Sequence, residues 1–162
     1  GQAEAIKSAL DQDQELRDRG TLYRSAAASL RAEAMLRTGD VAGALKRATD
    51  ESSHLWSSAA SRASAELTRA EALERLGRRK EAAAAARSAL TVARGLDGPW
   101  TVARAAAAIL KNEPECSDAS EIHSEGRSQL KRFLEFVPAE NRDSVLLSED
   151  VVSAMATIGE AK

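Results

Sequence analysis

Residues 63–90 read ASAELTRAEALERLGRRKEAAAAARSAL and determine how the chain folds. Alanine, the best helix former, is frequent on both sides of Gly77. Glycine adopts positive φ without steric cost, so Gly77 is expected to end one helix and reverse the chain into the next. The stretch therefore predicts a pair of helices joined by a tight turn.

The same pattern occurs 38 residues earlier in the chain. Ala32 and Gly39 recur as Ala70 and Gly77, and Ala108 lies one further step of 38 residues along. A repeat of this length is typical of stacked helical arrays, in which each repeat buries its apolar face against its neighbour. Such arrays usually present a binding surface and seldom carry out chemistry.

The composition agrees with a helical array. Hydrophobic residues are 43% of the 162 residues, aromatic residues only 3%, and alanine makes up about a fifth. The small alanine side chain lets helix axes approach closely. Because almost no alternating strand pattern is present, we predict an all-α fold, and the length suits one domain over residues 1–162.

Glycine and proline residues divide the chain into the expected elements. Gly98-Pro99 starts a third helix pair, and Val137-Pro138 ends it. We predict helix pairs over 21–54, 56–96 and 99–136, followed over 138–162 by a C-terminal cap of two short helices. Ser117 or Asp118 is expected to cap the second helix of the third pair, and Ser148 the last helix.

The first 20 residues align with the second helix of a repeat whose first helix would precede residue 1. An array cut inside a repeat exposes an apolar face, here around Ile6 and Leu10. We therefore expect the chain to be a fragment of a longer protein that can form a homodimer through this end.

Small residues and turn glycines follow one spacing in the first two pairs. The set reads Ala32, Gly39, Ala44 and then Ala70, Gly77, Ala82. This spacing resembles the tetratricopeptide repeat, whose small residues at these places let two antiparallel helices pack closely. The resemblance covers about residues 2–137, and the period of 38 in place of the usual 34 implies longer helices. It implies a tetratricopeptide-like α-solenoid, in an alanine-rich style similar to regions of large bacterial signalling and regulatory proteins.

The resemblance also implies a binding groove, because the first helix of each pair lines the concave surface of such arrays. Carried over by position, the groove residues are Ser29, Glu33 and Leu36, then Leu67, Glu71 and Glu74, then Val102, Ile109 and Asn112. Chaperone-binding members clamp a terminal carboxylate with basic residues, whereas this chain has three glutamates at comparable places. The groove is therefore expected to suit an apolar or basic helical segment. The alternative is that the protein's own helices fill it.

The sequence offers no signature of catalysis or of a bound cofactor. His54, His123 and Cys116 lack the spacing of a metal site or a catalytic pair. Neither a phosphate-binding glycine loop nor a nucleophile elbow is present. We predict no enzyme activity, no cofactor and no metal, and we expect Trp56 and Trp100 to fill gaps between repeats.

Charge and cysteine content indicate the setting. The net charge is −2, and no apolar run is long enough to span a bilayer, so no membrane partner is expected. A single cysteine excludes an intrachain disulfide and favours a cytoplasmic location. The basic cluster Arg75, Arg78, Arg79 and Lys80 lacks stacking aromatics, so nucleic-acid binding is not expected.

Two functional hypotheses follow. The favoured one is a non-catalytic protein–protein interaction or scaffold module that binds a protein or peptide in the groove. The alternative is a ligand-sensing regulatory domain of a multidomain transcription regulator or kinase. A closed apolar cavity lined by Leu67, Ile109 and Phe133 would favour the sensor, and an open groove would favour protein binding.

Overall fold

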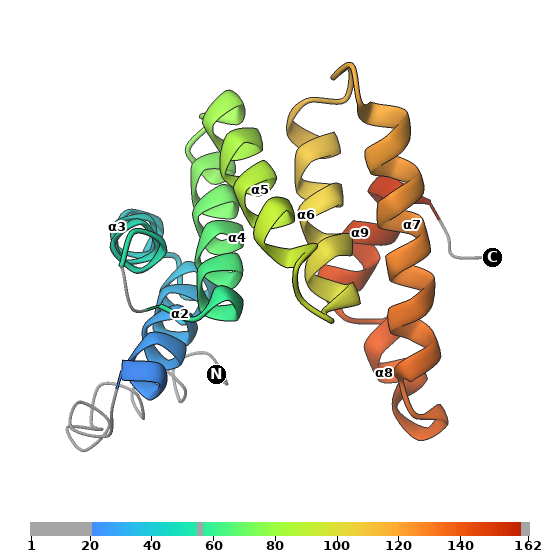
Figure 1. Cartoon of the computed structure of the whole chain (residues 1–162), viewed down its shortest axis with the longest axis horizontal. Helices are drawn as coiled ribbons and strands as arrows, with labels where there is room; N and C mark the ends of the chain where they lie inside the picture. The colour runs from blue at the N-terminus through green and yellow to red at the C-terminus, as the bar shows by residue number, and fades with distance from the viewer. Residues whose placement is uncertain (1–20, 55–56, 160–162) are drawn as a thin grey trace.

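The computed structural model describes residues 21–54 and 57–159, and within these ranges the chain consists of helices and short connections without a strand (Figure 1). The all-α prediction is confirmed for this part of the chain. The described helices are α2 (Thr21–Arg37), α3 (Val41–Ser52), α4 (Ala59–Arg75), α5 (Arg79–Ala93), α6 (Pro99–Asn112), α7 (Ala119–Phe136), the 3₁₀ helix η2 (Ala139–Asn141), α8 (Arg142–Leu146) and α9 (Glu149–Ile158). The predicted helix over 1–20, and with it the dimer surface at Ile6 and Leu10, lies outside the described residues.

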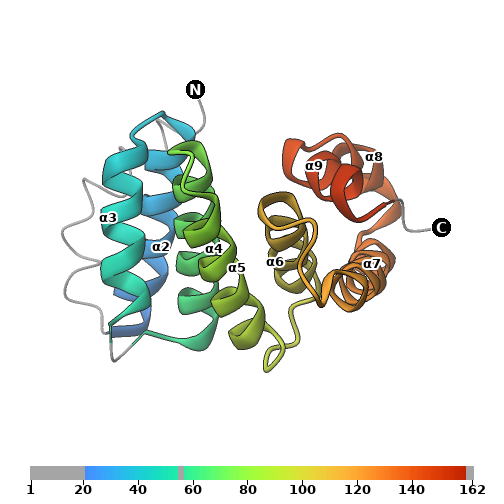
Figure 2. The ribbon, with the colours of Figure 1, turned by 90° about the horizontal axis from the view of Figure 1, so that it is seen from above.

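The helices from α2 to α7 follow one another across the molecule (Figure 1). Each packs against the next, and α2 also contacts α4, which in turn contacts α6. The first helices of the three predicted pairs therefore form a continuous row. The last two helices lie together on one side of α6 and α7 (Figure 2), and α9 packs mainly against α6.

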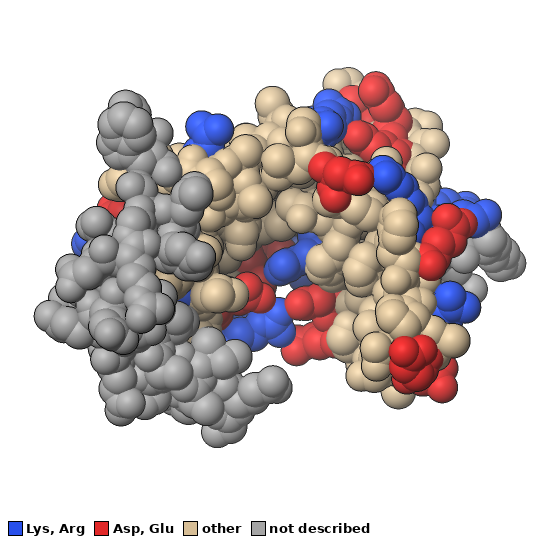
Figure 3. Space-filling model, turned by 60° about the horizontal axis from the view of Figure 1, so that its bottom comes forward, with Lys and Arg blue, Asp and Glu red and all other residues tan. Residues whose placement is uncertain are grey.

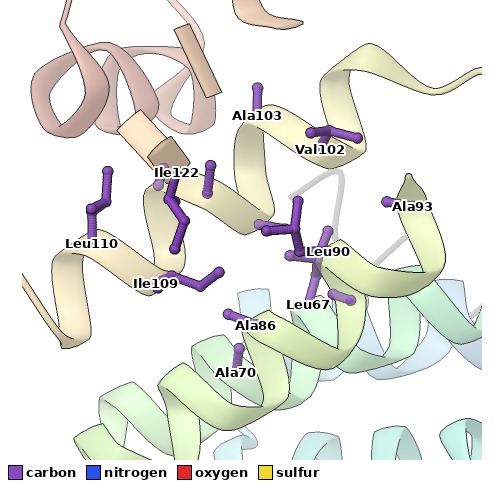
Figure 4. Close-up of a cluster of buried hydrophobic side chains, with 14 of the residues drawn as sticks. Leu67, Ala70, Ala86, Leu90, Ala93, Val102, Ala103, Ile109, Leu110 and Ile122 are labelled. Atoms are coloured by element: carbon purple, nitrogen blue, oxygen red, sulfur yellow. The ribbon is translucent and has the colours of Figure 1, made fainter. Parts of the chain in front are cut away.

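The core is built largely from alanine, with a few leucine and isoleucine side chains between the helices. Side chains from α4, α5 and α6 meet in the cluster drawn in Figure 4, where Leu67, Leu90 and Ile109 belong to one buried group. Trp100 of α6 stacks on Phe133 of α7 with ring centroids 5.0 Å apart, and both pack against this core. Trp100 thus packs against the core as expected, but its stacking partner belongs to the same predicted helix pair and not to a neighbouring repeat. Trp56 lies outside the described residues.

The two turn glycines adopt the conformation that the sequence predicts. Gly39 has φ of +91° and Gly77 has φ of +75°. In each turn the following amide donates to a carbonyl five residues back: Asp40 to Met35, and Arg78 to Leu73, both at 2.9 Å. This hydrogen bond and left-handed glycine are the features of a Schellman cap. The third pair has no such glycine, and residues 113–118 connect α6 to α7.

We expect Gly77→Ala to lower the free energy of unfolding by about 1 kcal/mol, because an L-residue with a side chain is strained at positive φ. A Cβ atom at Gly77 would meet nothing within 4 Å, so the cost is purely conformational. Gly95→Ala is the matched control, because Gly95 lacks a positive φ and its Cβ would make only an ordinary 3.5 Å contact. Equal urea-unfolding midpoints for the two variants would contradict this reading of the turn.

Candidate functional site

The structure separates the nine predicted groove residues into two groups. Six are buried: Ser29, Leu36, Leu67, Val102, Ile109 and Asn112. The side chains of the other three, Glu33, Glu71 and Glu74, are between a quarter and a third exposed. The expected groove surface therefore differs from the one observed, since most of its apolar members belong to the interior and only the glutamates reach solvent.

A cleft of about 260 Å³ lies where α4, α6 and α9 meet. Figure 3 shows a hollow with acidic and basic side chains around it. The lining residues are Leu67, Glu71, Glu74 and Arg75 of α4, Arg104, Ala107, Ala108 and Lys111 of α6, and Glu149, Asp150, Ser153, Ala154 and Thr157 of α9. Helix α9, the last helix of the described residues, thus forms one wall and occupies part of the space beside the row of α4 and α6.

The face of α6 that lines the cleft differs by one residue from the face that the repeat predicts. The cleft residues of α6 that correspond to Leu67, Glu71 and Glu74 of α4 are Arg104, Ala108 and Lys111. Each lies 37 residues after its counterpart, whereas the repeat predicts a step of 38. One residue along a helix is a rotation of about 100°. This rotation directs Ile109 and Asn112 into the interior and brings Arg104 and Lys111 to the cleft.

The sequence did contain a signal for this rotation. Within α6 the residues Val102, Ala106 and Ile109 recur at the spacing of one buried helix face, and all three are buried. The apolar periodicity of α6 is therefore a better guide to its orientation than the 38-residue step.

Each glutamate of the predicted groove has a cationic partner within the protein. Glu71 pairs with Arg75 at 2.8 Å, and Arg75 also donates to the Leu36 carbonyl of α2 at 2.7 Å. Glu74 pairs with Lys111 across the cleft at 2.6 Å. The amide nitrogen of Asn112 donates to the same Glu74 carboxylate at 3.3 Å. These contacts join α2, α4 and α6 and neutralise much of the acidic surface that the sequence indicated.

Arg37, at the last turn of α2, reaches the first turn of α9. Its Nη2 lies 2.6 Å from Oδ2 of Asp150 and 3.7 Å from Oε1 of Glu33, and its Nη1 lies 3.9 Å from Oε2 of Glu149. Burial lowers the pKa of Arg37, but the hydrogen bond and charge of Asp150, with the nearby Glu71 and Glu33, outweigh it and leave the pKa above its ordinary value. The guanidinium is thus held among carboxylates from three helices.

A second set of ion pairs joins α5 to α7. Arg87 forms a two-pronged pair with Asp118 at 2.7 and 3.0 Å, and Arg94 forms another with Glu125 at 2.9 and 2.6 Å. The residues of the second pair lie seven positions after those of the first on both helices.

Asp118 stands at the N-cap position of α7 as predicted, but its side chain makes no capping hydrogen bond and binds Arg87. The Ser148 hydroxyl likewise stands at an N-cap but donates to the Val145 carbonyl.

We expect Asp118→Asn to lower the melting temperature at neutral pH and to have little effect near pH 2. The hydrogen bond from Arg87 lowers the pKa of Asp118 to about 2, so its carboxylate stabilises the fold above about pH 4. That contribution is lost as the pH falls from about 4 to about 2. Asp143→Asn, at an exposed position of α8, is the control. The melting temperatures of both variants are measured across this pH range. If they change with pH in the same way, the stabilising role of the Asp118 carboxylate is wrong.

The other candidate features are accounted for by local contacts. Arg78 of the basic cluster pairs with Glu81 at 2.6 Å on an exposed turn. Within residues 21–54 and 57–159, no group of three or more histidine, cysteine or acidic side chains is arranged to hold a metal ion. The same ranges contain no helix with the length and apolarity needed to cross a bilayer. Leu67 and Ile109 are core residues, and Phe133 packs against the cluster to which they belong.

Comparison of the chain with protein-family models, curated proteins and solved structures finds no match in any of the three sets. The cleft and the residues that surround it are therefore the features from which a function can be inferred.

Proposed function

We propose that the chain is a tetratricopeptide-like α-solenoid that acts as a non-catalytic protein–protein interaction module. The observation that carries the proposal is the open, charge-lined cleft beside the row of α2, α4 and α6. In a helical array this is the surface on which a partner segment lies, because the first helices present their side chains side by side. The recurring turn glycines and the packing of successive helices support the array.

The cleft is large enough for part of a partner segment. A volume of about 260 Å³ is at the low end for a complete ligand site, so it accommodates one or two side chains of a helix or extended peptide that lies across α4 and α6. Ala107 and Ala108 are apolar lining residues, and around them four carboxylates outnumber three cations: Glu71, Glu74, Glu149 and Asp150 against Arg75, Arg104 and Lys111. An apolar residue flanked by basic ones matches this arrangement.

The ligand-sensing alternative receives less support. It requires a closed apolar cavity at Leu67, Ile109 and Phe133, but these side chains belong to one packed cluster. The cleft that is present is lined by charged and hydroxyl side chains as well as alanine. We therefore favour protein binding over small-molecule sensing.

Ala108→Arg tests the cleft directly. A partner captured from a cell extract would be titrated against the wild-type protein and the variant by calorimetry. We expect the arginine to fill the cleft and weaken binding about tenfold or more, which corresponds to roughly 1.4 kcal/mol. Ala84→Arg, the same change at an exposed alanine of α5 outside the cleft, is expected to bind as the wild type does. Unchanged affinity of the folded Ala108 variant would refute the proposal.

A further inference from the structure

The contact between Arg37 and Asp150 joins parts of the chain that are 113 residues apart. Arg37 ends α2, the first described helix, and Asp150 lies in the first turn of α9, the last one. Between them the helices pack in the order α2 on α4, α4 on α6 and α6 on α9. The ion pair therefore closes a ring of four helices around the cleft, with Asp150 and Glu149 in its wall.

Helix α9 is held in place by two kinds of contact. Val151, Ala154 and Ile158 are buried, and Ala154 and Ile158 belong to the main core cluster beside α6. The contacts that join α9 to α2 are made by charged side chains: Arg37 with Asp150 and with Glu149. Helix dipoles favour this pairing, because the cation is at a C-terminus and the carboxylates are at an N-terminus. The α2 contact is therefore sensitive to charge, whereas the α6 contact is not.

We infer that Arg37, Asp150 and Glu149 form an electrostatic clasp that holds the end of α2 to the start of α9 beside the cleft, and that a cationic partner segment releases this clasp by replacing Arg37 at these carboxylates. We expect the partner segment to be cationic and not anionic, because three carboxylates surround the Arg37 guanidinium: Glu33, Glu149 and Asp150. A lysine or arginine of the partner enters this cluster without charge repulsion once Arg37 has left it. The inference rests on the proposed binding function and adds how access to the cleft is controlled.

The clasp itself is testable without any partner. Spin labels at Leu30→Cys of α2 and Val152→Cys of α9, both half-exposed positions, report the distance between the two helices after Cys116 is replaced by serine. We expect a narrow distance distribution at low salt and a shift to longer, broader distances in Arg37→Ala. Salt at about 1 M, where the Debye length is about 3 Å, should produce the same shift.

Three further variants assign the shift to the ion pair. Asp150→Asn preserves the size of the side chain and should shift the distances as Arg37→Ala does. The exchange Arg37→Asp with Asp150→Arg should restore the narrow distribution. Arg78→Ala removes an ion pair of similar geometry that lies within a single turn of the chain, and it should have no effect. The clasp would be overturned if the distances were unchanged in both Arg37→Ala and Asp150→Asn. It would also be overturned if the charge exchange failed to restore the narrow wild-type distribution.

The partner chemistry is tested with two synthetic amphipathic helices of about 15 residues, one of leucine and lysine and the other of leucine and glutamate. We expect the lysine peptide to shift the wild-type distances to the range of Arg37→Ala and the glutamate peptide to leave them unchanged at equal ionic strength. No shift with the lysine peptide, or an equal shift with both, overturns release by a cation. The clasp and the binding function are judged separately, by the variants above and by the Ala108 substitution.

Discussion

Ile109→Glu is expected to destabilise the protein by about 4 kcal/mol or more, a large part of the 5–15 kcal/mol that holds a typical domain together. Ile109 is fully buried in the main core cluster, where a carboxylate would lose its hydration without gaining a partner. The repeat makes the opposite prediction, because Ile109 occupies the position of the partly exposed Glu71. The variant therefore distinguishes the rotated α6 from an α6 in strict repeat register.

Ala108→Glu is the matched substitution, one residue away on the face that lines the cleft. We expect it to remain folded, with a free energy of unfolding within about 1 kcal/mol of the wild type, because a carboxylate at this partly exposed position can extend into the open cleft and stay hydrated. Urea unfolding followed by circular dichroism gives both values. The rotated orientation of α6 would be wrong if Ile109→Glu were as stable as Ala108→Glu.

Gly126→Val is expected to lower the free energy of unfolding by about 3 kcal/mol, the upper end of the cost of overpacking a core. A Cβ atom at Gly126 would lie 2.7 Å from Cβ of Ala106 and 3.4 Å from two methyl carbons of Ile158. Cβ of Ala106 is fixed by the backbone of α6, so relief requires α6 and α7 to move apart. Ser128→Val places the same side chain on an exposed position of α7 and should cost far less.

A second test of this contact exchanges alanine and glycine between α6 and α7, so that the methyl group of Ala106 is moved to position 126. Gly126→Ala should be destabilising by about 1 kcal/mol after the gain in helix propensity is subtracted. Combining it with Ala106→Gly removes the clash, so the pair should be more stable than the sum of the single variants predicts. If the changes in unfolding free energy of the two single variants simply add up in the double variant, α6 and α7 are not in close contact at Gly126.

The sequence predicts best what depends on local chemistry. The turns at Gly39 and Gly77 and the start of α6 at Pro99 follow from backbone preferences of single residues, and the structure has them at these places. The alanine-rich interior follows from the repeat, which requires small residues where helices cross. These features need no knowledge of which segments meet in space.

The features that the sequence missed depend on tertiary contacts. The rotation of α6 results from its packing between α5 and α7, which outweighs the repeat register at Ile109. Arg37 and Asp150 meet only because α9 folds back beside α6, and no local pattern relates residues so far apart. Asp118 stands where a capping residue was expected, yet its two-pronged pair with Arg87 replaces the capping hydrogen bond.

The alanine interior has a consequence for how this protein can be mapped experimentally. More than half of the buried hydrophobic residues in the described part of the chain are alanine, among them Ala86, Ala89 and Ala103, each with no exposed surface. Alanine scanning, the usual way to find residues that matter, leaves these positions unchanged. Few methylene groups are available to remove, and little space is available to add one. Substitutions that enlarge a side chain will therefore reveal where the helices touch.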